Sequence, residues 1–423
     1  MSIQRVTSKS RIRITISAPG DKSISHRAIM FGALASGVTE IEGFLPGEDC
    51  LSTIACFRKL GVDIAAAGDR VTVNGKGLWG LTAPGEDALD VGNSGTTMRL
   101  ITGVLAGQSF DSRLTGDASI KKRPMKRVFD PLRLMGAKFS DHETAPFTIC
   151  GRPLKGVSYT LIVASAQVKS AIILAALYAK GETIITESQP TRDHTEIMLK
   201  YFGADLKKDG RLISVKPVPR LYARKVQIPG DISSAAFFIA LGLITPESEI
   251  TVTGVGINPT RTGIIDAFIS MGGRISITNR RTIDGEETAD ITARSSNLKG
   301  TDIYGAMIPR MIDEIPILAA AAAFAEGRTV IRDAEELKYK ESNRIRAMAM
   351  ELSKLGGQVS ETPDGMIIEG GRPLFGTIVD SHGDHRIAMS LAIAACAISG
   401  DTFIKNSECV NISFSNFFEL LKV

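Results

Sequence analysis

An internal repeat restricts the fold of this 423-residue chain more than any other feature of its sequence. Six times, a short polar cluster leads into an apolar segment rich in Ala, Ile and Leu, and a strand-like segment that starts with Gly usually follows. The clusters begin near positions 21, 93, 165, 231, 313 and 384, which is a spacing of about 70 residues. Self-similarity at a fixed period is the signature of repeated supersecondary units.

A second kind of helical segment lies between the apolar ones and ends at glycine. Residues 49–61 (DCLSTIACFRKLG) and 344–357 (RIRAMAMELSKLGG) have apolar residues at three- and four-residue spacing, which predicts amphipathic helices. A closing Gly is typical of a helix end, because it adopts positive φ without strain. Residues 70–75 (RVTVNG) and 365–370 (GMIIEG) alternate as half-buried strands do. Each unit is therefore predicted to be strand–helix–strand–helix–strand–strand.

The apolar helices have no polar face, so we expect them to be buried and the amphipathic helices to lie outside. Six such units predict an α/β protein of two domains, each a ring of sheets around three buried helices. The chain length supports this, since it exceeds what one hydrophobic core usually serves. The alternative is one long solenoid, but the sequence shows no polar capping repeats.

The cysteine spacing and the distribution of apolar residues favour a cytoplasmic protein over a secreted or membrane protein. The cysteines form no C-x-x-C pair, so we expect reduced thiols and no zinc site. The N-terminal residues lack the apolar core of a signal peptide. The most apolar stretch, Ile315 to Ala325, contains Pro316 and is too short to span a bilayer. The net charge of +4 is weaker than that of a dedicated nucleic-acid binder, but clustered basic residues would suit small anions.

The polar clusters at the starts of the apolar helices are candidate anion sites, because a helix N-terminus offers unpaired N–H groups and a partial positive charge. The clusters are Lys22–Arg27, Asn93–Thr97, Ser165–Gln167, Asp231–Ser234, Asp313–Glu314 and Asp384–Arg386. The alternative is that the clusters only cap helices. For Ser165, Asp231 and Ser233, both the anion site and the cap remain open. Capping does not explain Lys22, Arg27 or Arg386, because a cation in the first turn opposes the helix dipole.

Two further stretches carry cations, and known nucleotide and catalytic motifs are missing. Residues 121–127 (KKRPMKR) and 338–344 (KYKESNR) would alternatively be solvated surface, a nucleic-acid patch, or a helix cap with surface charges. The sequence has no P-loop, no G-x-G-x-x-G and no G-x-S-x-G. Only His382 and His385 are close together among the histidines, so we expect no metal site.

Eight segments, in this order, resemble the 5-enolpyruvylshikimate-3-phosphate synthase family: DKSISHRA, GNSGTTMRL, LTGDASIKKRPM, SAQVKSA, RDHTE, DEIP, KESNR and GDHRIAM. The SAQVKSA and GNSGTTMRL forms are more similar to the class II branch. The resemblance implies an inside-out α/β barrel of two domains, each with three βαβαββ repeats and buried helices, the enolpyruvyl transferase fold. It places one domain at residues 19–228, the other at 1–18 plus 229–423, and the active site in the cleft between them.

The resemblance also implies substrates and site residues. The chain would transfer the enolpyruvyl group of phosphoenolpyruvate to shikimate 3-phosphate by addition–elimination, with Asp313, Glu341 and Lys22 as catalytic residues. The implied shikimate 3-phosphate contacts are Lys22, Ser23, Arg27, Ser165, Ala166, Gln167, Arg192, Asp313 and Lys340. The implied phosphoenolpyruvate contacts are Lys22, Asn93, Gly95, Thr96, Arg123, Gln167, Glu341, Arg344 and Arg386. We expect no cofactor, no metal, and no nucleic-acid or membrane partner. We expect the protein to be a monomer, and we expect glyphosate to inhibit it, less strongly in the Gly95→Ala variant.

This chain departs from the class I pattern of the family at a few positions. A C-terminal lysine of class I aligns at or beside Ile412, an asparagine with Glu336, and a serine with Ala166, which can bind only through its backbone. One alternative is a UDP-N-acetylglucosamine enolpyruvyl transferase, but that family has Lys-Asn where Lys22-Ser23 stands and usually a cysteine within residues 115–127, where none occurs. The other alternative is a protein that binds RNA or another polyanion. This alternative is disfavoured because the basic run at residues 121–127 has no interleaved aromatic residues on which bases could stack.

Overall fold

The computed structural model describes residues 2–85 and 87–422, and its internal contacts divide the chain into two compact units. The N-terminal unit comprises Gly20–Ile228 together with the short segment Ile283–Glu286. The C-terminal unit comprises the chain up to Pro19, the segment Pro229–Thr282 and the chain from Glu287 onward. Each unit has its own cluster of buried apolar side chains.

In the N-terminal unit, apolar and amphipathic helices alternate along the chain, as the repeat predicts. The apolar helices are α1 (Lys22–Leu34), α3 (Gly95–Ala106) and α5 (Ala166–Ala176). The amphipathic helices are α2 (Glu48–Lys59), α4 (Lys126–Leu134) and α6 (His194–Tyr201), and a 3-10 turn, η1, spans Ile120–Lys122. Most residues of α1, α3 and α5 are buried, because these helices offer no polar face to water.

The sheets of the N-terminal unit have the strand orders β16-β3-β5-β4 with β17 beside β3, β6-β7-β9-β8 and β11-β13-β15-β14, and β10 pairs with β12. The strands of the first sheet are β3 (Ala35–Glu42), β4 (Asp63–Ala67), β5 (Arg70–Lys76), β16 (Leu221–Tyr222) and β17 (Lys225–Gln227). Those of the second are β6 (Leu89–Asp90), β7 (Asp111–Thr115), β8 (Lys138–Phe139) and β9 (Phe147–Cys150). The remaining strands are β10 (Leu154–Lys155), β11 (Ser158–Thr160), β12 (Ala179–Lys180), β13 (Thr183–Thr186), β14 (Asp205–Asp209) and β15 (Leu212–Lys216).

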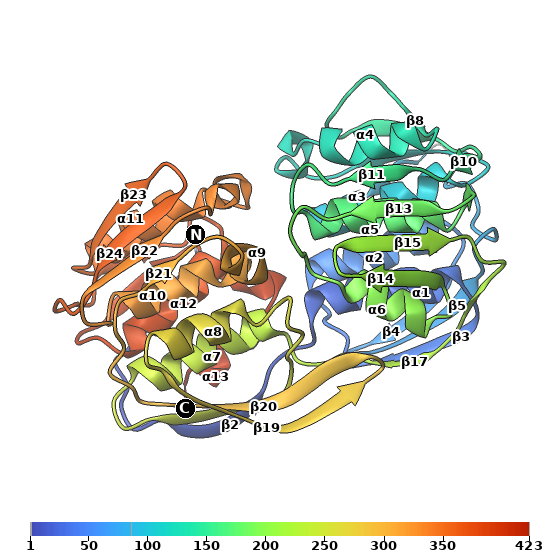
Figure 1. Cartoon of the computed structure of the whole chain (residues 1–423). Helices are drawn as coiled ribbons and strands as arrows, with labels where there is room; N and C mark the ends of the chain where they lie inside the picture. The colour runs from blue at the N-terminus through green and yellow to red at the C-terminus, as the bar shows by residue number, and fades with distance from the viewer. Residues whose placement is uncertain (1, 86, 423) are drawn as a thin grey trace. The chain divides into compact units, whose positions relative to one another are not determined.

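The C-terminal unit repeats this plan. Its apolar helices are α7 (Ile232–Ile244), α10 (Ile315–Ala322) and α12 (His385–Cys396), which pack on one another (Figure 1). Its other helices are α8 (Gly263–Ser270), α9 (Met307–Met311), α11 (Arg344–Lys354) and α13 (Phe417–Leu420), with 3-10 turns η2 (Ile312–Glu314), η3 (Glu335–Tyr339) and η4 (Ser407–Ile412). Every residue of α12 is buried, so this helix forms the centre of the unit's core.

The sheets of the C-terminal unit have the strand orders β19-β20-β18-β2, β21-β22-β24-β23 and β1-β26-β25. The strands of the first are β2 (Arg13–Ser17), β18 (Glu249–Gly256), β19 (Arg274–Ile283) and β20 (Glu286–Arg294). Those of the second are β21 (Asp302–Ile303), β22 (Arg328–Ile331), β23 (Gln358–Thr362) and β24 (Gly365–Glu369). Those of the third are β1 (Ile3–Val6), β25 (Ile378–Asp380) and β26 (Thr402–Lys405).

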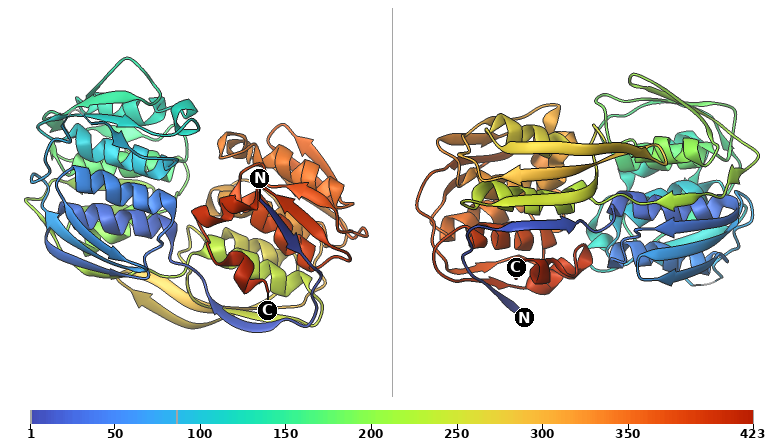
Figure 2. Two further views of the ribbon diagram at one scale, coloured as in Figure 1. Left: turned by 180° about the vertical axis from the view of Figure 1, so that it is seen from behind. Right: turned by 90° about the horizontal axis from the view of Figure 1, so that it is seen from below.

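The first strand of a repeat normally precedes its buried helix and lies parallel to the next strand, as β6 does beside β7 and β21 beside β22. Two repeats take this strand from a distant part of the chain. Strand β17 lies parallel to β3, and β2 lies parallel to β18. The sixth repeat ends in η4 and α13, and β1 completes its sheet by pairing antiparallel with β26, where Figure 2 shows the dark blue first strand beside red strands.

The predicted α/β fold with βαβαββ repeats and buried helices is confirmed, with the sixth repeat as a variation on it. No helix in residues 2–85 and 87–422 combines the length and the apolar character that crossing a bilayer requires.

Candidate active site

Side chains of the polar clusters cap the starts of α1, α3, α5, α7 and α12, whereas Glu314 at the start of α10 makes no such cap. The capping side chains, each accepting a hydrogen bond from a backbone N–H in the first turn, are Asp21, Ser94, Ser165, Asp231 and Asp384. Capping is therefore confirmed for Ser165 and Asp231. Ser233 does not cap α7; its hydroxyl contacts Glu314 and accepts a 2.8 Å hydrogen bond from Nη2 of Arg261.

In the C-terminal unit, Arg344 joins three carboxylates around the start of α11. Its Nη1 lies 3.2 Å from Oδ1 of Asp313, its Nη2 lies 2.6 Å from Oε2 of Glu341, and its Nε lies 2.8 Å from Oδ2 of Asp384. The three carboxylates come from η2, from the residues just before α11, and from the cap of α12. One planar guanidinium thus fixes groups that are far apart in the sequence.

The electrostatics of this group follow from its burial. Burial alone would lower the pKa of Arg344, but the negative charges of Asp384, Glu341 and Asp313 raise it above its ordinary value. Burial would raise the pKa of Asp384, and Arg344 outweighs this and holds that pKa below its ordinary value. Arg344 and Asp384 therefore stay ionised at neutral pH, as a buried ion pair must.

Two more cations lie beside Asp313. Nζ of Lys340 lies 3.8 Å from Oδ1 of Asp313 and 3.0 Å from Oε1 of Glu336. Nη1 of Arg386 donates a 2.9 Å hydrogen bond to the backbone oxygen of Asp313. The structure thus brings Asp313, Lys340, Glu341, Arg344 and Arg386 together in the C-terminal unit.

In the N-terminal unit, Lys22 at the start of α1 lies next to an acidic residue of α2. Its Nζ is 3.0 Å from Oδ2 of Asp49, and both side chains are only partly exposed. A carboxylate from the neighbouring helix therefore offsets the repulsion between this cation and the dipole of α1. Capping did not explain this lysine, and an ion pair within the unit accounts for part of its placement.

Arg123 follows η1 and lies beside the start of α3. Its Nη2 donates a 2.7 Å hydrogen bond to Oδ1 of Asn93, whose Nδ2 donates a 2.6 Å hydrogen bond to Oδ2 of Asp117. The basic run at residues 121–127 is therefore in part a structured element, because one of its arginines is oriented by an asparagine of the α3 cluster.

Helices α3 and α5 place a third group beside Arg123. Nη1 of Arg99 donates a 2.7 Å hydrogen bond to Oε1 of Gln167, and Nε2 of Gln167 donates a 3.1 Å bond to Oγ1 of Thr96. A methyl group on Gly95 would lie 2.8 Å from Nη1 of Arg99 and 2.9 Å from Nη1 of Arg123. Both guanidinium groups thus approach the start of α3 so closely that a side chain at position 95 would displace them.

The remaining predicted residues lie on α1, α5 and the segment before α6. Ser23 and Arg27 are on α1, and Arg27 is buried. Ala166 is the first residue of α5, where it offers a backbone group. Burial lowers the pKa of Arg27, and the positive charge of Arg192, which precedes α6, acts in the same direction.

The sequence reasoning missed Arg99, Asp49 and Asp384 as polar partners within these groups. Arg99 is four residues after Gly95 on the same face of α3, and it is a lone cation within an otherwise apolar helix. That isolation was the available signal. Asp384 was predicted to belong to a candidate anion cluster or to cap a helix, and the structure shows that it both caps α12 and pairs with Arg344.

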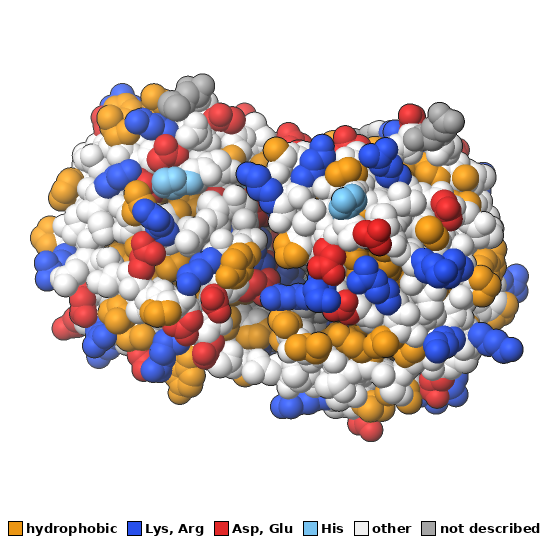
Figure 3. Space-filling model, turned by 90° about the horizontal axis from the view of Figure 1, so that it is seen from above, with side chains coloured by type: hydrophobic (Ala, Val, Ile, Leu, Met, Phe, Trp, Pro, Cys, Tyr) orange, Lys and Arg blue, Asp and Glu red, His pale blue; other side chains and the backbone are white. Residues whose placement is uncertain are grey.

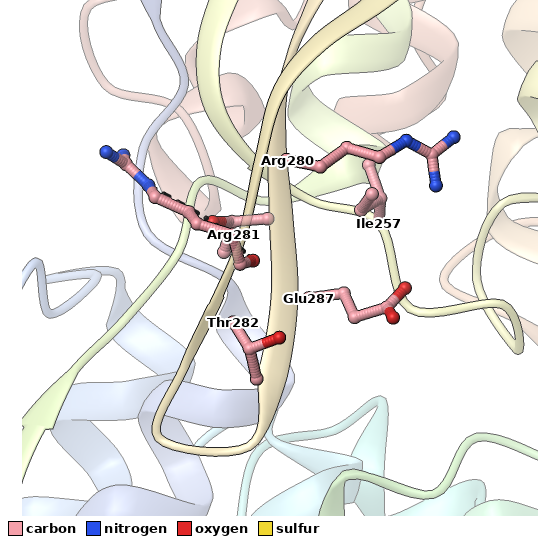
Figure 4. A pocket seen from close by; sticks show the side chains of 6 residues that line it. Ile257, Arg280, Arg281, Thr282 and Glu287 are labelled. Atoms are coloured by element: carbon pink, nitrogen blue, oxygen red, sulfur yellow. Dashed lines mark hydrogen bonds between the residues drawn. The ribbon is translucent and has the colours of Figure 1, made fainter.

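A pocket of about 140 Å³ lies along the β19–β20 hairpin, and its lining includes none of the predicted site residues. Arg280, Arg281, Thr282 and Glu287 line it together with Ile257 and Thr288, and Figure 4 shows the guanidinium groups of Arg280 and Arg281 pointing to opposite sides of the strand. They do not converge on one ligand position. Within residues 2–85 and 87–422, no group of three or more His, Cys, Asp and Glu side chains has an arrangement that could hold a metal ion.

The family model for EPSP synthase (3-phosphoshikimate 1-carboxyvinyltransferase) matches residues 6–421 of this chain. The chain belongs to the EPSP synthase family. It is a transferase of the shikimate pathway, as the members of this family are.

Relatives of the chain agree along almost the whole length. A 3-phosphoshikimate 1-carboxyvinyltransferase from Thermoanaerobacter sp. strain X514 is 56% identical over 416 residues, which cover 98% of each chain. Another, from Brevibacillus brevis, is 53% identical over 420 residues, which cover 99% of this chain and 98% of the other. A solved structure of EPSP synthase from Acinetobacter baumannii is 47% identical, with a TM-score of 0.90 over 99% of this chain and 97% of that one.

The departures from the class I pattern have local explanations in the fold. Ile412 ends η4 and packs against the hydrophobic core of the C-terminal unit, so this position has a packing role. Glu336 lies in η3 and accepts a hydrogen bond from Lys340.

Proposed function

We propose that the chain transfers the enolpyruvyl group of phosphoenolpyruvate to the 5-hydroxyl of shikimate 3-phosphate, and that Asp313, Glu341 and Lys22 carry the chemistry. The observation that carries the assignment is that Arg344 holds Asp313 and Glu341, two carboxylates of different elements, at 3.2 Å and 2.6 Å. A base and an acid held on one rigid cation are what an addition followed by an elimination requires.

Asp313 accepts the proton of the 5-hydroxyl of shikimate 3-phosphate while the oxygen of that hydroxyl attacks C2 of phosphoenolpyruvate. Glu341, which enters this step protonated, donates its proton to C3 with Lys22 as a second donor, and this gives a tetrahedral adduct. In the elimination, a proton of C3 returns to Glu341 while the bond between C2 and the phosphate oxygen breaks, and inorganic phosphate leaves with the proton that Asp313 had accepted. No oxidant or reductant takes part, and the cations around the substrates stabilise the developing negative charge.

The substrates together carry two phosphates and two carboxylates, which suits the predicted cations. We assign shikimate 3-phosphate to Lys22, Ser23, Arg27, Ser165, Ala166, Gln167, Arg192, Asp313 and Lys340. We assign phosphoenolpyruvate to Lys22, Asn93, Gly95, Thr96, Arg123, Gln167, Glu341, Arg344 and Arg386. Support comes from the hydrogen bonds that orient Arg123 by Asn93 and Gln167 by Arg99, because preorganised guanidinium groups lose little entropy when they bind.

Glyphosate is proposed as an inhibitor that competes for the phosphoenolpyruvate residues, with Gly95 as the position that admits it. The close approach of the guanidinium groups of Arg99 and Arg123 to Gly95 supports this proposal, because a larger residue at position 95 would displace them. We also propose a monomer in the cytoplasm, and this location suits five cysteines that form no disulfide bond in the described part of the chain. Sedimentation and cell fractionation test these two points, and a stable dimer or a membrane-bound pool would contradict them.

A phosphate-release assay with both substrates tests the function. Phosphate release that requires both shikimate 3-phosphate and phosphoenolpyruvate is expected. Release with UDP-N-acetylglucosamine in place of shikimate 3-phosphate would instead assign the chain to the related transferase. The mixture of acidic and basic side chains on the face in Figure 3 gives no support to a nucleic-acid partner, because such a partner favours a continuous basic stripe.

A further inference from the structure

Arg27 on α1 is 4% exposed, and hydroxyl groups of two other helices hold its guanidinium. Its Nε donates a 2.7 Å hydrogen bond to Oγ1 of Thr195 on α6, and its Nη2 donates a 3.0 Å bond to Oγ of Ser170 on α5. Its Nη1 donates a 2.8 Å bond to the backbone oxygen of Ser23. The two hydroxyl oxygens lie 2.6 Å apart, so they share a hydrogen bond and form one acceptor pair.

These contacts leave a defined part of the guanidinium available. An arginine has five N–H donors, and within the described part of the chain Arg27 uses one on Nε, one on Nη1 and one on Nη2. One N–H therefore remains on each terminal nitrogen. Two such donors match two oxygens of a phosphate or a carboxylate.

A buried ion group fixes the helices that carry the two hydroxyls. Lys169, next to Ser170, has its Nζ 2.7 Å from Oε1 of Glu196, which is next to Thr195, and 2.8 Å from Oε1 of Glu187. All three charged side chains are almost fully buried. Burial lowers the pKa of Arg27 to about 10 and Glu196 raises it, so the guanidinium remains charged at neutral pH.

We propose that Thr195 and Ser170 are positioning residues for shikimate 3-phosphate, whose hydroxyl pair sets the rotation of Arg27 and leaves its two remaining terminal N–H groups for an anionic oxygen pair of that substrate. The inference rests on the proposed function, in which Arg27 contacts shikimate 3-phosphate. It adds residues that no substrate touches, and it explains why a hydroxyl residue stands beside each partner of the Lys169–Glu196 pair.

The test uses the full-length enzyme and measures KM for each substrate, together with calorimetric binding of shikimate 3-phosphate alone. Thr195→Val removes the hydroxyl at almost constant volume. We expect KM and Kd for shikimate 3-phosphate to rise about tenfold, which is the loss of one hydrogen bond to a charged group. KM for phosphoenolpyruvate should not change, and Thr195→Ser should restore the wild-type values. Ser170→Ala is the second variant and should shift the same two constants.

Thr102→Val is the matched control. Thr102 is a buried threonine of the same unit whose hydroxyl donates to the backbone oxygen of Met98, and it does not contact Arg27. Its loss should leave both KM values unchanged. A rise in both KM values in Thr195→Val would show a general structural role and overturn the proposal, as would failure of Thr195→Ser to restore binding.

A double-mutant cycle separates this inference from the proposed function. Arg27→Ala should weaken shikimate 3-phosphate binding, and Thr195→Val should add nothing in that background. If Arg27→Ala leaves binding unchanged, the role of Arg27 in the proposed function is wrong. If Arg27→Ala weakens binding and neither Thr195→Val nor Ser170→Ala does, only the positioning role is wrong. An equal loss from Thr195→Val with and without Arg27 also overturns it.

Discussion

The guanidinium of Arg344 donates a 2.6 Å hydrogen bond from Nη2 to Oε2 of Glu341, three residues earlier in the chain. Arg344 is almost fully buried, whereas the Glu341 side chain is 27% exposed. The carboxylate is therefore anchored by a buried cation on a side chain that is itself partly exposed, and a group that exchanges protons with a substrate needs both properties.

Glu341→Gln should lower turnover by about 100- to 10,000-fold, because the amide keeps an acceptor for Arg344 and cannot deliver a proton. Steady-state phosphate release and thermal unfolding measure the two effects, and the unfolding temperature should hardly move. Glu369→Gln, which alters an exposed pair with Arg328, is the control and should keep full turnover. Near-normal turnover in Glu341→Gln would remove the acid role.

Arg344→Met should destabilise the C-terminal unit by about 3–5 kcal/mol, because it leaves the buried carboxylate of Asp384 without its cation. Urea unfolding measures the change. Arg5→Met removes an exposed pair with Asp401 in the same unit and should cost about 1 kcal/mol or less. Equal losses in the two variants would contradict the account of the buried ion pair.

His26 should make the fold sensitive to acid. It is 0% exposed and bonded to Thr53, and burial, with Lys22 and Arg27, lowers its pKa from 6.5 to about 3. Below pH 6.5, His26 of the unfolded chain binds a proton and His26 of the folded chain does not. The contribution of His26 to the free energy of unfolding is therefore complete above pH 6.5 and is lost as the pH falls toward 3.

His26→Asn should flatten that dependence, and the difference between the unfolding free energies of wild type and variant should change by about 1.4 kcal/mol per pH unit below 6.5. Urea unfolding across this pH range provides the measurement. Parallel curves for the two proteins would show that His26 is protonated in the folded state.

Gly95→Ala should displace the guanidinium groups of Arg99 and Arg123, since its methyl group would lie within 3.0 Å of both. Crowding of about 1–3 kcal/mol predicts an inhibition constant for glyphosate that rises about 5- to 100-fold, with a smaller rise in KM for phosphoenolpyruvate. Gly32→Ala on α1, which meets only the side chain of Thr39, is the control and should leave both constants unchanged. Equal inhibition of the Gly95→Ala variant and the wild type would refute the assignment.

Much of the fold follows from the repeat, because a helix without a polar face must be buried and a helix with one must lie at a surface. The pairing of β2 with β18 and of β17 with β3 does not follow from it. Strands of three to five alternating residues match many partners equally well, and the period along the chain says nothing of which one they meet.

The candidate site was predictable where a charged residue stood in a place that local structure disfavours, as Lys22 and Arg386 do at helix starts. The orienting partners were not, because Thr195, Ser170 and Asp49 are ordinary residues for helices. Their importance depends on which helices lie side by side, and that is settled by packing between α1, α2, α5 and α6 rather than by any local pattern.

The pairing of β1 with β26 joins residues 3–6 to residues 402–405. During synthesis on the ribosome, β1 emerges long before β26, its partner. The N-terminal unit can fold while the remainder is still being made, because apart from Ile283–Glu286 it is one continuous segment. The C-terminal unit cannot close the sheet of β1 and β26 until β26 has been translated, so β1 must stay unpaired, and free of aggregation, until then, whereas β2 can pair as soon as β18 has emerged.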